Sequence, residues 1–379
     1  MFFTKHNVAV HLNTKKTPII LRRILLLIVL SLVFACSSKK ETLINYTNSQ
    51  IEYSGRIDSS KTKAAELYWS GTSIKFNFEG ESISALLKNE KGDNYYNIII
   101  DNDSLFILRP DTIKRYYKLA SKLPKGKHTL EIFKRTEWNR GKTSFYGFKL
   151  EGNSKVLKKP ISKKRKIEFY GNSITAGYAV EDLSGKDSPD STYTNNYLSY
   201  AAITARHFDA KYQCICKSGI GITVSWFPLI MPEMYDRLIP KDPNSKWNFS
   251  LYTPDVVVIN LLQNDSWLVN MPENDEFKAR FGTKPPNEKY IINAYQQFVS
   301  KIRKHYPRAN IICTLGSMDA SKKGSKWIKY IRKAVDHLND TAIYTHVMPY
   351  KKSVGHPSIE EQELMAKSLI NFIKENIDW

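Results

Sequence analysis

Apolar and polar positions alternate along the first half of the chain. From Ile51 to about Leu150 the alternation comes in short runs that are punctuated by Gly, Asn and Asp. Six such runs are AELYWSG, SIKFNFEG, ISALLKN, YYNIIIDN, HTLEIFKR and FYGFKLEG. A period of two indicates strands with one buried face, and no helical period of useful length interrupts them. The pattern predicts a β-sandwich domain over residues 51–152.

The second half follows another pattern, in which a short apolar strand precedes a helix with one apolar face. Strands are predicted at Ile167–Tyr170, Tyr212–Cys216, Val256–Leu262, Asn310–Leu315 and Ala342–Val347. Helical spacing is clearest from Ile291 to Ile302 and recurs after Trp327 and Leu364. This alternation predicts an α/β domain over residues 167–379, with a parallel five-stranded sheet covered on both faces. The proline- and lysine-rich residues 153–166 are the predicted linker.

The first 36 residues have the features of a targeting segment. Arg22 and Arg23 precede an uncharged run, Ile24–Phe34, which is followed by Ala35 and Cys36. The run is shorter than the roughly 20 residues of a membrane-spanning helix and is typical of a secretion signal. The sequence VFAC resembles a bacterial lipobox, in which the cysteine is acylated.

We therefore expect a lipoprotein signal peptide over residues 1–36, lipidation at Cys36, and a tether over residues 37–50. The protein would then be exported and lipid-anchored to the bacterial cell envelope, in the periplasm or at the outer-membrane surface. An ordinary signal peptide with a chance cysteine is the alternative. Either reading sends the protein across the membrane.

Charge and cysteine content narrow the possible partners. The formal net charge is +20 at pH 7, enough to attract an anionic partner. However, the basic residues are scattered, with Lys163–Lys166 the densest run, and no nucleic-acid motif is present. A solvated basic surface is therefore the favoured interpretation. No CxxC or Cys/His cluster indicates a metal site, and we predict no cofactor. Cys214, Cys216 and Cys313 are predicted to be buried thiols.

Candidate chemistry gathers at the carboxyl ends of the predicted strands, where parallel sheets place their sites. Ser173 follows the first strand, Gly219 the second, Asn264 the third and His356 the last. Serine becomes a good nucleophile when a base takes its proton, and histidine titrates near neutrality. Amide donors stabilise the negative oxygen of a tetrahedral intermediate. We therefore predict acyl transfer with Ser173 as nucleophile and His356 as base.

The predicted oxyanion hole consists of the backbone amides of Ser173 and Gly219 and the side-chain amide of Asn264. Gly221 is the alternative to Gly219, because one sequence leaves the register of this loop open. Asp265 is expected to cap the following helix or to support Asn264, with orientation of His356 as the alternative.

Four short blocks at these positions, GNSIT, SGIG, LQND and GHPS, resemble those of the SGNH (GDSL-like) hydrolases. Upstream, YSGRI, WSGTSIKFNFEG, GKHTLEIFKRTE and FYGFKL resemble the amino-terminal sandwich of carbohydrate esterase family 2. The resemblance covers nearly all of the chain from residue 51. It implies a flavodoxin-like SGNH domain preceded by a jelly-roll. It also implies removal of acetyl groups from plant polysaccharides such as xylan or glucomannan, or from their oligosaccharides.

The chain departs from this family pattern at two positions. Asn172 replaces the usual aspartate before the nucleophile. Ser353 stands where the acid of the triad is expected, three residues before His356. Some members of the resembled family work as a Ser–His dyad in which a backbone carbonyl orients the ring. A dyad is therefore predicted here, oriented by Ser353 Oγ or by the carbonyl of residue 353 or 354.

Aromatic residues near the blocks are candidate sugar contacts. Trp267, Trp226 and Tyr178 offer flat faces that sugar rings stack on, and the alternative is that they belong to the core. Two other functions stay open. One is a glycan-binding lipoprotein whose hydrolase domain is inactive, because the acid is missing. The other is a lipase or thioesterase of the GDSL type.

Overall fold

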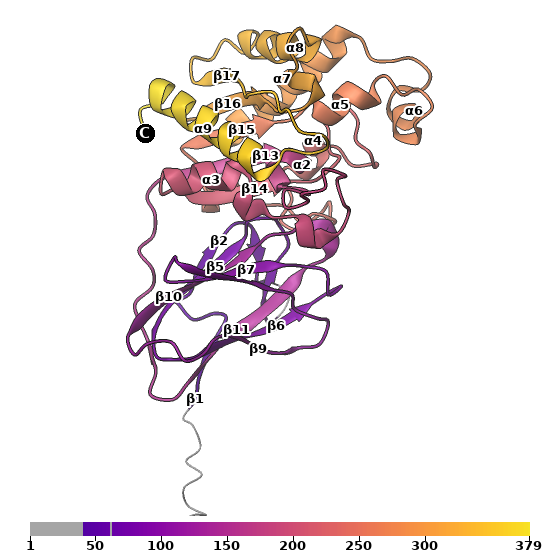
Figure 1. Ribbon diagram of the computed structural model, residues 1–379. Helices are drawn as coiled ribbons and strands as arrows, with labels where there is room; N and C mark the ends of the chain where they lie inside the picture. Colours follow the sequence, from indigo (N-terminus) through magenta and orange to yellow (C-terminus); the bar gives the residue numbers. More distant parts are fainter. Residues whose placement is uncertain (1–40, 61–62) are drawn as a thin grey trace, which may run out of the picture. The chain divides into compact units, whose positions relative to one another are not determined.

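The computed structural model describes residues 41–60 and 63–379 (Figure 1). The predictions for the signal peptide, for Cys36 and for the start of the tether lie outside these residues. Residues Glu41–Trp379 form one compact unit. None of the helices in the described ranges is long and apolar enough to cross a membrane.

The amino-terminal half is an antiparallel β-sandwich of two sheets, as predicted. The first sheet has the order β3-β4-β11-β6-β9, with β1 also paired to β11. Its strands are β1 (Glu41–Asn45), β3 (Ile57–Asp58), β4 (Ala65–Leu67), β6 (Ile83–Asn89), β9 (Arg115–Ala120) and β11 (Thr143–Glu151). The second sheet has the order β12-β5-β10-β7-β8, with β2 paired to β5. Its strands are β2 (Glu52–Ser54), β5 (Ser73–Glu79), β7 (Tyr96–Ile100), β8 (Ser104–Leu108), β10 (Lys127–Lys134) and β12 (Lys155–Val156).

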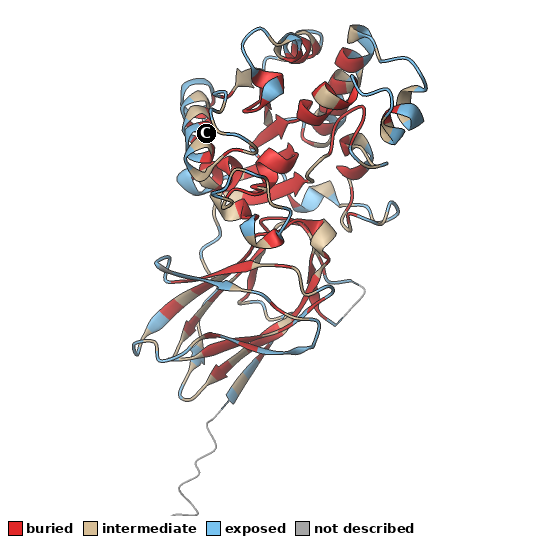
Figure 2. Cartoon of the chain, turned by 45° about the vertical axis from the view of Figure 1, so that its right-hand side comes forward, coloured by how far each residue is buried: buried red, intermediate tan, exposed pale blue. Residues whose placement is uncertain are grey.

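Alternating side chains fill the space between these two sheets. Phe76 and Phe148, from opposite sheets, stack with their ring centroids 4.9 Å apart. Every second residue of β5 is buried, as its sequence pattern predicts. Figure 2 shows this buried layer between the sheets.

Two predicted boundaries are wrong because their residues pair with strands. The predicted tether 37–50 contains β1, which pairs with β11 from Glu41 to Asn45. The predicted linker 153–166 contains β12, whose Lys155 and Val156 pair with β5. Both are short edge segments in polar surroundings, so their sequences resemble loops.

The carboxyl-terminal half is the predicted α/β domain, with the parallel strand order β14-β13-β15-β16-β17. The strands are β13 (Lys166–Gly171), β14 (Lys211–Cys216), β15 (Val256–Asn260), β16 (Asn310–Leu315) and β17 (Ile343–Val347). The α-helices are α2 (Ser173–Ala176), α3 (Tyr200–His207), α4 (Met231–Met234), α5 (Gln263–Leu268), α6 (Asp275–Phe281), α7 (Glu288–His305), α8 (Lys326–Asp336) and α9 (Ile359–Asn376). Short 3-10 turns of this half are η2 (Ser191–Tyr193), η3 (Asn196–Leu198), η4 (Phe249–Leu251) and η5 (Asp319–Ser321), and η1 (Trp138–Arg140) lies between β10 and β11 of the sandwich.

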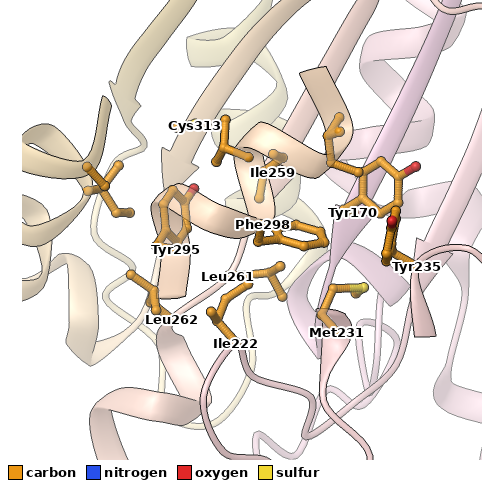
Figure 3. Close-up of a cluster of buried hydrophobic side chains, with 14 of the residues drawn as sticks. Tyr170, Ile222, Met231, Tyr235, Ile259, Leu261, Leu262, Tyr295, Phe298 and Cys313 are labelled. Carbon is orange, nitrogen blue, oxygen red and sulfur yellow. The ribbon is translucent and has the colours of Figure 1, made fainter. Parts of the chain in front are cut away.

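Helices cover the parallel sheet on both faces, which confirms the predicted fold class. Residues of α7 and α8 join one hydrophobic cluster, and residues of α3 and α9 join another. Figure 3 shows part of the first cluster, where Phe298 of α7 lies beside Tyr170 of β13. Cys214, Cys216 and Cys313 are buried free thiols, as predicted.

A buried ion pair joins the sandwich to the parallel sheet. Arg56 precedes β3, and its Nη2 lies 3.1 Å from Oε1 of Glu168 on β13, with both side chains fully buried. The Tyr170 hydroxyl and the Gln213 amide also donate to Glu168, at 2.9 and 2.6 Å. A buried charge of this kind requires its partners, since an unpaired one carries a large desolvation penalty. The sandwich and the α/β domain are therefore held together at β13 by a buried, paired charge.

Candidate active site

Ser173 lies where β13 ends and α2 begins. A Cβ atom on Gly171 would lie 2.0 Å from Thr175 Oγ1, so only glycine allows the helix to turn back this closely. Asn172 caps the helix, because its Oδ1 accepts a hydrogen bond from the amide of Ile174 at 3.0 Å. Asparagine thus provides the turn hydrogen bond that an aspartate would provide. Ser173 retains 7% exposure at the bottom of the site.

His356 lies in the loop between β17 and α9, and its Nε2 is 2.8 Å from Ser173 Oγ. This distance is suitable for direct transfer of the serine proton to the imidazole. The ring of Tyr178 packs edge-on against the imidazole, with centroids 4.9 Å apart. The structure thus brings together the two residues predicted as nucleophile and base, from the first and last strands of the domain.

A carboxylate holds the other side of the imidazole. Oδ2 of Asp187 lies 2.9 Å from Nδ1 of His356, and Oδ1 accepts a hydrogen bond from the His356 backbone amide at 2.6 Å. This contact becomes an ion pair only when the imidazole is protonated. A Cβ atom on Gly355 would lie 2.5 Å from Asp187 Oδ1, so the neighbouring glycine makes room for the acid.

Partial burial raises the pKa of Asp187, but two other effects outweigh it. Hydrogen bonds and the charge of His356, together with the charge of Lys351, hold this pKa below its ordinary value. The carboxylate is therefore ionised at neutral pH. Its contribution to stability is present above the pKa of the unfolded chain and is lost as the pH falls through the lowered folded-state pKa.

The predicted dyad without an acid is therefore not what the structure shows. Ser353 Oγ donates to Glu361 Oε2, and the Ser353 carbonyl accepts from Lys351 Nζ, so two of the three predicted orienting groups are engaged elsewhere. The third is the carbonyl of residue 354, but Asp187 is the group that contacts Nδ1 of His356. Sequence reasoning missed Asp187 because it looked for an acid close to the histidine. Asp187 is 169 positions away in the chain and lies in a polar loop with other acidic residues. No local spacing distinguishes it from Glu181, Asp182 or Asp190.

Two backbone amides at the site have no internal acceptor. Among the described residues, the amides of Ser173 and Gly219 donate to no group. The amide of Gly221, in contrast, donates to Ser225 Oγ at 2.9 Å. The Gly219 amide is therefore free to donate to an oxyanion, whereas the Gly221 amide is already used. The structure thus favours Gly219 over Gly221, the alternative that the sequence left open. Gly219 has φ +84°, a conformation that suits glycine.

The side-chain amide of Asn264 is oriented by two neighbours. Its Nδ2 donates to the carbonyl of Ile220 at 2.8 Å, and its Oδ1 accepts from Trp226 Nε1 at 3.1 Å. One N–H of this amide group remains for a third acceptor. Trp226 is 45% exposed, so its ring face is accessible while its N–H positions Asn264.

Asp265 has a different role from those expected. It is buried and accepts hydrogen bonds from the amides of Ile222 and Thr223 and from the Thr223 hydroxyl. Burial raises the pKa of Asp265, and these hydrogen bonds only partly oppose that effect. Asp265 therefore fixes the loop that follows Gly219 and does not orient His356.

The three predicted sugar contacts occupy different positions. Trp226 is exposed beside Asn264, and Tyr178 lies against His356. Trp267 packs against the second hydrophobic cluster, and its Nε1 donates to Asp319 Oδ2 at 2.9 Å. Of the three, Trp226 best retains a free aromatic face next to the predicted catalytic residues.

The sandwich holds both loops that complete the site. The Glu137 carboxylate accepts hydrogen bonds from the amide and the hydroxyl of Ser218, the residue before Gly219. Arg135 donates to the carbonyl of Thr192 at 2.9 Å and pairs with Glu181, so it holds the loop that carries Asp187. Two nearby residues of the sandwich, Arg135 and Glu137, therefore hold the loop that carries Asp187 and the loop that carries Gly219.

Replacing Glu137 with alanine is expected to lower kcat for ester hydrolysis about 10- to 100-fold, with a smaller change in KM. The substitution removes a charged acceptor from Ser218, and hydrogen bonds to charged groups contribute about 1.5–3 kcal/mol. Because oxyanion donors act in the transition state, the loss falls mainly on kcat. Steady-state kinetics with an acetyl ester measure the effect. The control is Glu273→Ala, which removes a carboxylate with an exposed side chain that is paired to Lys278; an unchanged kcat in Glu137→Ala would contradict this positioning role.

Within the described ranges, no group of three or more His, Cys, Asp or Glu side chains is placed to hold a metal ion.

Two family models match the chain in succession. Residues 53–160 match the model described as carbohydrate esterase 2 N-terminal. Residues 169–346 match the GDSL-like lipase/acylhydrolase family. The gap between them, residues 161–168, covers the end of the connecting segment and the first residues of β13.

Individual relatives agree with these matches. The chain is 35% identical to the cellulase/esterase CelE of Acetivibrio thermocellus over 343 residues, which is 88% of this chain and 40% of that protein. It therefore spans less than half of that relative. It is 24% identical over 341 residues to an acetylxylan esterase / glucomannan deacetylase of Cellvibrio japonicus, covering 88% of this chain and 90% of that protein.

A solved structure extends the similarity to three dimensions. A family two carbohydrate esterase from Clostridium thermocellum, in complex with cellohexaose, superposes with a TM-score of 0.75 at 35% identity. The match covers 86% of this chain and 98% of that one. Both the sandwich and the α/β domain are therefore shared.

Proposed function

Because this chain belongs to carbohydrate esterase family 2, a family of carboxylic ester hydrolases, we propose that it removes acetyl groups from plant polysaccharides such as xylan or glucomannan, or from their oligosaccharides. The observation that carries the proposal is the contact of Ser173 Oγ with His356 Nε2 at 2.8 Å. The names of two relatives, an esterase and an acetylxylan esterase / glucomannan deacetylase, support the substrate class.

The proposed acylation step begins with proton transfer from Ser173 Oγ to His356 Nε2. Oγ attacks the acetyl carbonyl carbon, and the carbonyl oxygen becomes a negatively charged oxyanion. The amides of Ser173, Gly219 and Asn264 donate to this oxygen, each contributing on the order of 3 kcal/mol to transition-state stabilisation. The intermediate collapses when His356 gives the proton to the sugar oxygen, which leaves as the free hydroxyl. Ser173 then carries the acetyl group.

Deacylation repeats these steps with water. His356 takes a proton from a water molecule, whose oxygen attacks the acetyl-serine carbonyl. The second tetrahedral intermediate expels Ser173 Oγ, which recovers its proton from His356, and acetate is released. Asp187 stabilises the imidazolium that forms in both halves of the cycle and holds the ring in the productive orientation. We propose the assembly Ser173, His356 and Asp187 in place of the dyad.

Acetate release from acetylated xylan and acetylated glucomannan tests the substrate class. We expect acetate from at least one of them, no requirement for added metal, and rates that fall as the acyl chain of synthetic esters is lengthened from acetyl to octanoyl. Preference for the longer chains would favour the lipase or thioesterase alternative instead. Glycan binding without hydrolysis of any acetyl ester would favour the inactive glycan-binding alternative, whose original motivation, a missing acid, is weakened by Asp187.

Export and acylation at Cys36 remain part of the proposal, on the evidence of the charged, apolar and lipobox segments of residues 22–36. Acetylated polysaccharide outside the cell would then be the natural substrate. Incorporation of labelled fatty acid into the wild type but not into Cys36→Ala would support the lipid anchor, and equal labelling of both would contradict it.

A further inference from the structure

The outer face of the first sandwich sheet carries a shallow groove. Two adjoining hollows of about 320 and 370 Å³ lie on it and share Lys63 and Tyr146 in their walls. We call this surface the tyrosine groove and define it by six residues: Leu43, Lys63, Lys88, Lys114, Tyr116 and Tyr146. Its residues come from β1, β6, β9, β11 and the segments beside them, whereas Ser173 and His356 belong to the α/β domain.

The backbone of the sheet shapes this groove. Pairing aligns Asn45, Gly147, Leu86 and Tyr116 across four neighbouring strands. A Cβ atom on Gly147 would lie 2.0 Å from the carbonyl oxygen of Ile44, so only glycine fits at this position. No side chain therefore projects from this part of the groove. The pairing of β11 with β6 shifts between Phe145 and Gly147 and leaves Tyr146 as the extra residue of a bulge. Such bulges redirect a side chain out of the regular pattern.

The tyrosines present their rings beside lysine ammonium groups. Lys114 Nζ lies 3.8 Å from the centre of the Tyr146 ring, and Lys149 Nζ lies 4.8 Å from that of Tyr116. Tyr116 is 40% exposed. Flat aromatic faces bind the C–H faces of sugar rings, and the Lys114 ammonium group attracts a negative substituent on the same ligand. Lys149 is already paired with Glu41 at 2.9 Å.

The positive charges of the groove are not all paired with carboxylates of the protein. Among the described residues, Lys63, Lys88 and Lys114 have no carboxylate within ion-pair distance. The hollow formed by Leu43, Lys114 and Tyr116 has two lysines and no acidic residue in its walls. The second hollow includes Glu66 and Glu90, but Glu66 pairs with Lys142 at 2.9 Å. An anionic ligand would complete these contacts.

A larger cavity between the sandwich and α3 provides a useful contrast. It measures about 490 Å³, yet its lysines are paired internally. The three pairs are Lys75–Glu131, Lys211–Glu52 and Lys163–Asp209, at 3.1, 3.5 and 3.1 Å. That cavity has the balanced charge of a domain interface, whereas the tyrosine groove has unpaired lysines beside the exposed Tyr116 and the partly buried Tyr146.

We propose that the tyrosine groove is a second glycan-binding site, specific for polysaccharides that carry uronic acids. Tyr116 and Tyr146 stack on sugar rings of the main chain, and Lys63, Lys88 and Lys114 pair with the carboxylates. Binding there requires no hydrolysis at Ser173, so the proposal can fail or succeed independently of the proposed esterase activity.

Calorimetry with the full chain carrying Ser173→Ala tests the proposal without turnover. The probes are xylo-oligosaccharides bearing glucuronic acid and neutral xylo-oligosaccharides of equal length. We expect the acidic probe to bind at least about tenfold more tightly, and its Kd to rise with salt concentration. Adding Tyr116→Ala or Lys114→Gln to this variant should raise the Kd of the acidic probe about 3- to 10-fold.

Matched controls are Tyr290→Ala and Lys278→Gln, which remove an exposed tyrosine and a lysine paired on the surface of the other domain. These should leave the Kd unchanged. Equal binding of the acidic and neutral probes would overturn the proposal, as would a Kd unaffected by Tyr116→Ala and Lys114→Gln. Binding of phosphatidylglycerol vesicles that depends on the groove, without glycan binding, would also overturn it and would identify a lipid surface as the ligand.

Discussion

Ser173→Ala is expected to lower kcat for acetyl-ester hydrolysis on the order of 10⁴- to 10⁶-fold. The substitution removes the atom that forms the acyl bond, while the fold should persist because Asn172, not Ser173, caps α2. The loss should nearly equal that of His356→Ala, and the double variant should be little worse than either single one. Groups that act as one unit show this non-additivity.

Initial rates of acetate release and thermal unfolding of the three variants measure this prediction. Ser250→Ala is the matched control, because it removes an exposed serine hydroxyl that contacts only its neighbour Asn248. A serine-directed phosphonate should label the wild type and Ser250→Ala but not Ser173→Ala. Wild-type rates in Ser173→Ala would show that another group is the nucleophile.

Asp187→Asn is expected to lower kcat about 10²- to 10⁴-fold with little change in KM. Asparagine can retain the acceptor for the His356 backbone amide, but it removes the charge that stabilises the imidazolium. Its amide group can also donate to Nδ1 and select the tautomer that cannot act as base at Nε2. The effect arises in the transition state, so kcat should fall more than substrate binding does.

Asp190→Asn is the control for Asp187→Asn, because Asp190 lies in the same loop and caps η2 through the amide of Thr192. Ser353→Ala should also stay within a few-fold of the wild type, since the Ser353 hydroxyl bonds to Glu361. A loss of less than about tenfold in Asp187→Asn, with a larger loss in Ser353→Ala, would instead support the dyad oriented from residue 353.

The local features of the fold and site could be predicted from the sequence because they depend on neighbouring residues. Continuous apolar runs such as Val256–Asn260 form strands buried on both faces, and the one-sided helix at Ile291–Ile302 packs on the sheet. The placement of Ser173 and His356 at strand ends followed from the topology of parallel sheets. The edge strands β1 and β12 were missed because their short polar sequences have no periodic signal.

The two-part architecture, the candidate nucleophile and base, and the set of possible oxyanion donors could thus all be predicted from residue patterns along the chain. The preference for Gly219 over Gly221 required the folded structure, because it depends on the hydrogen bond that the Gly221 amide donates to Ser225 Oγ. Asp187 became visible as the partner of His356 in the folded structure, where it reaches the imidazole from a loop held by Arg135 of the sandwich. Residues as far apart in the chain as Asp187 and His356 are brought together by the packing of the folded backbone. A pattern of neighbouring residues carries no information on which distant side chains will meet.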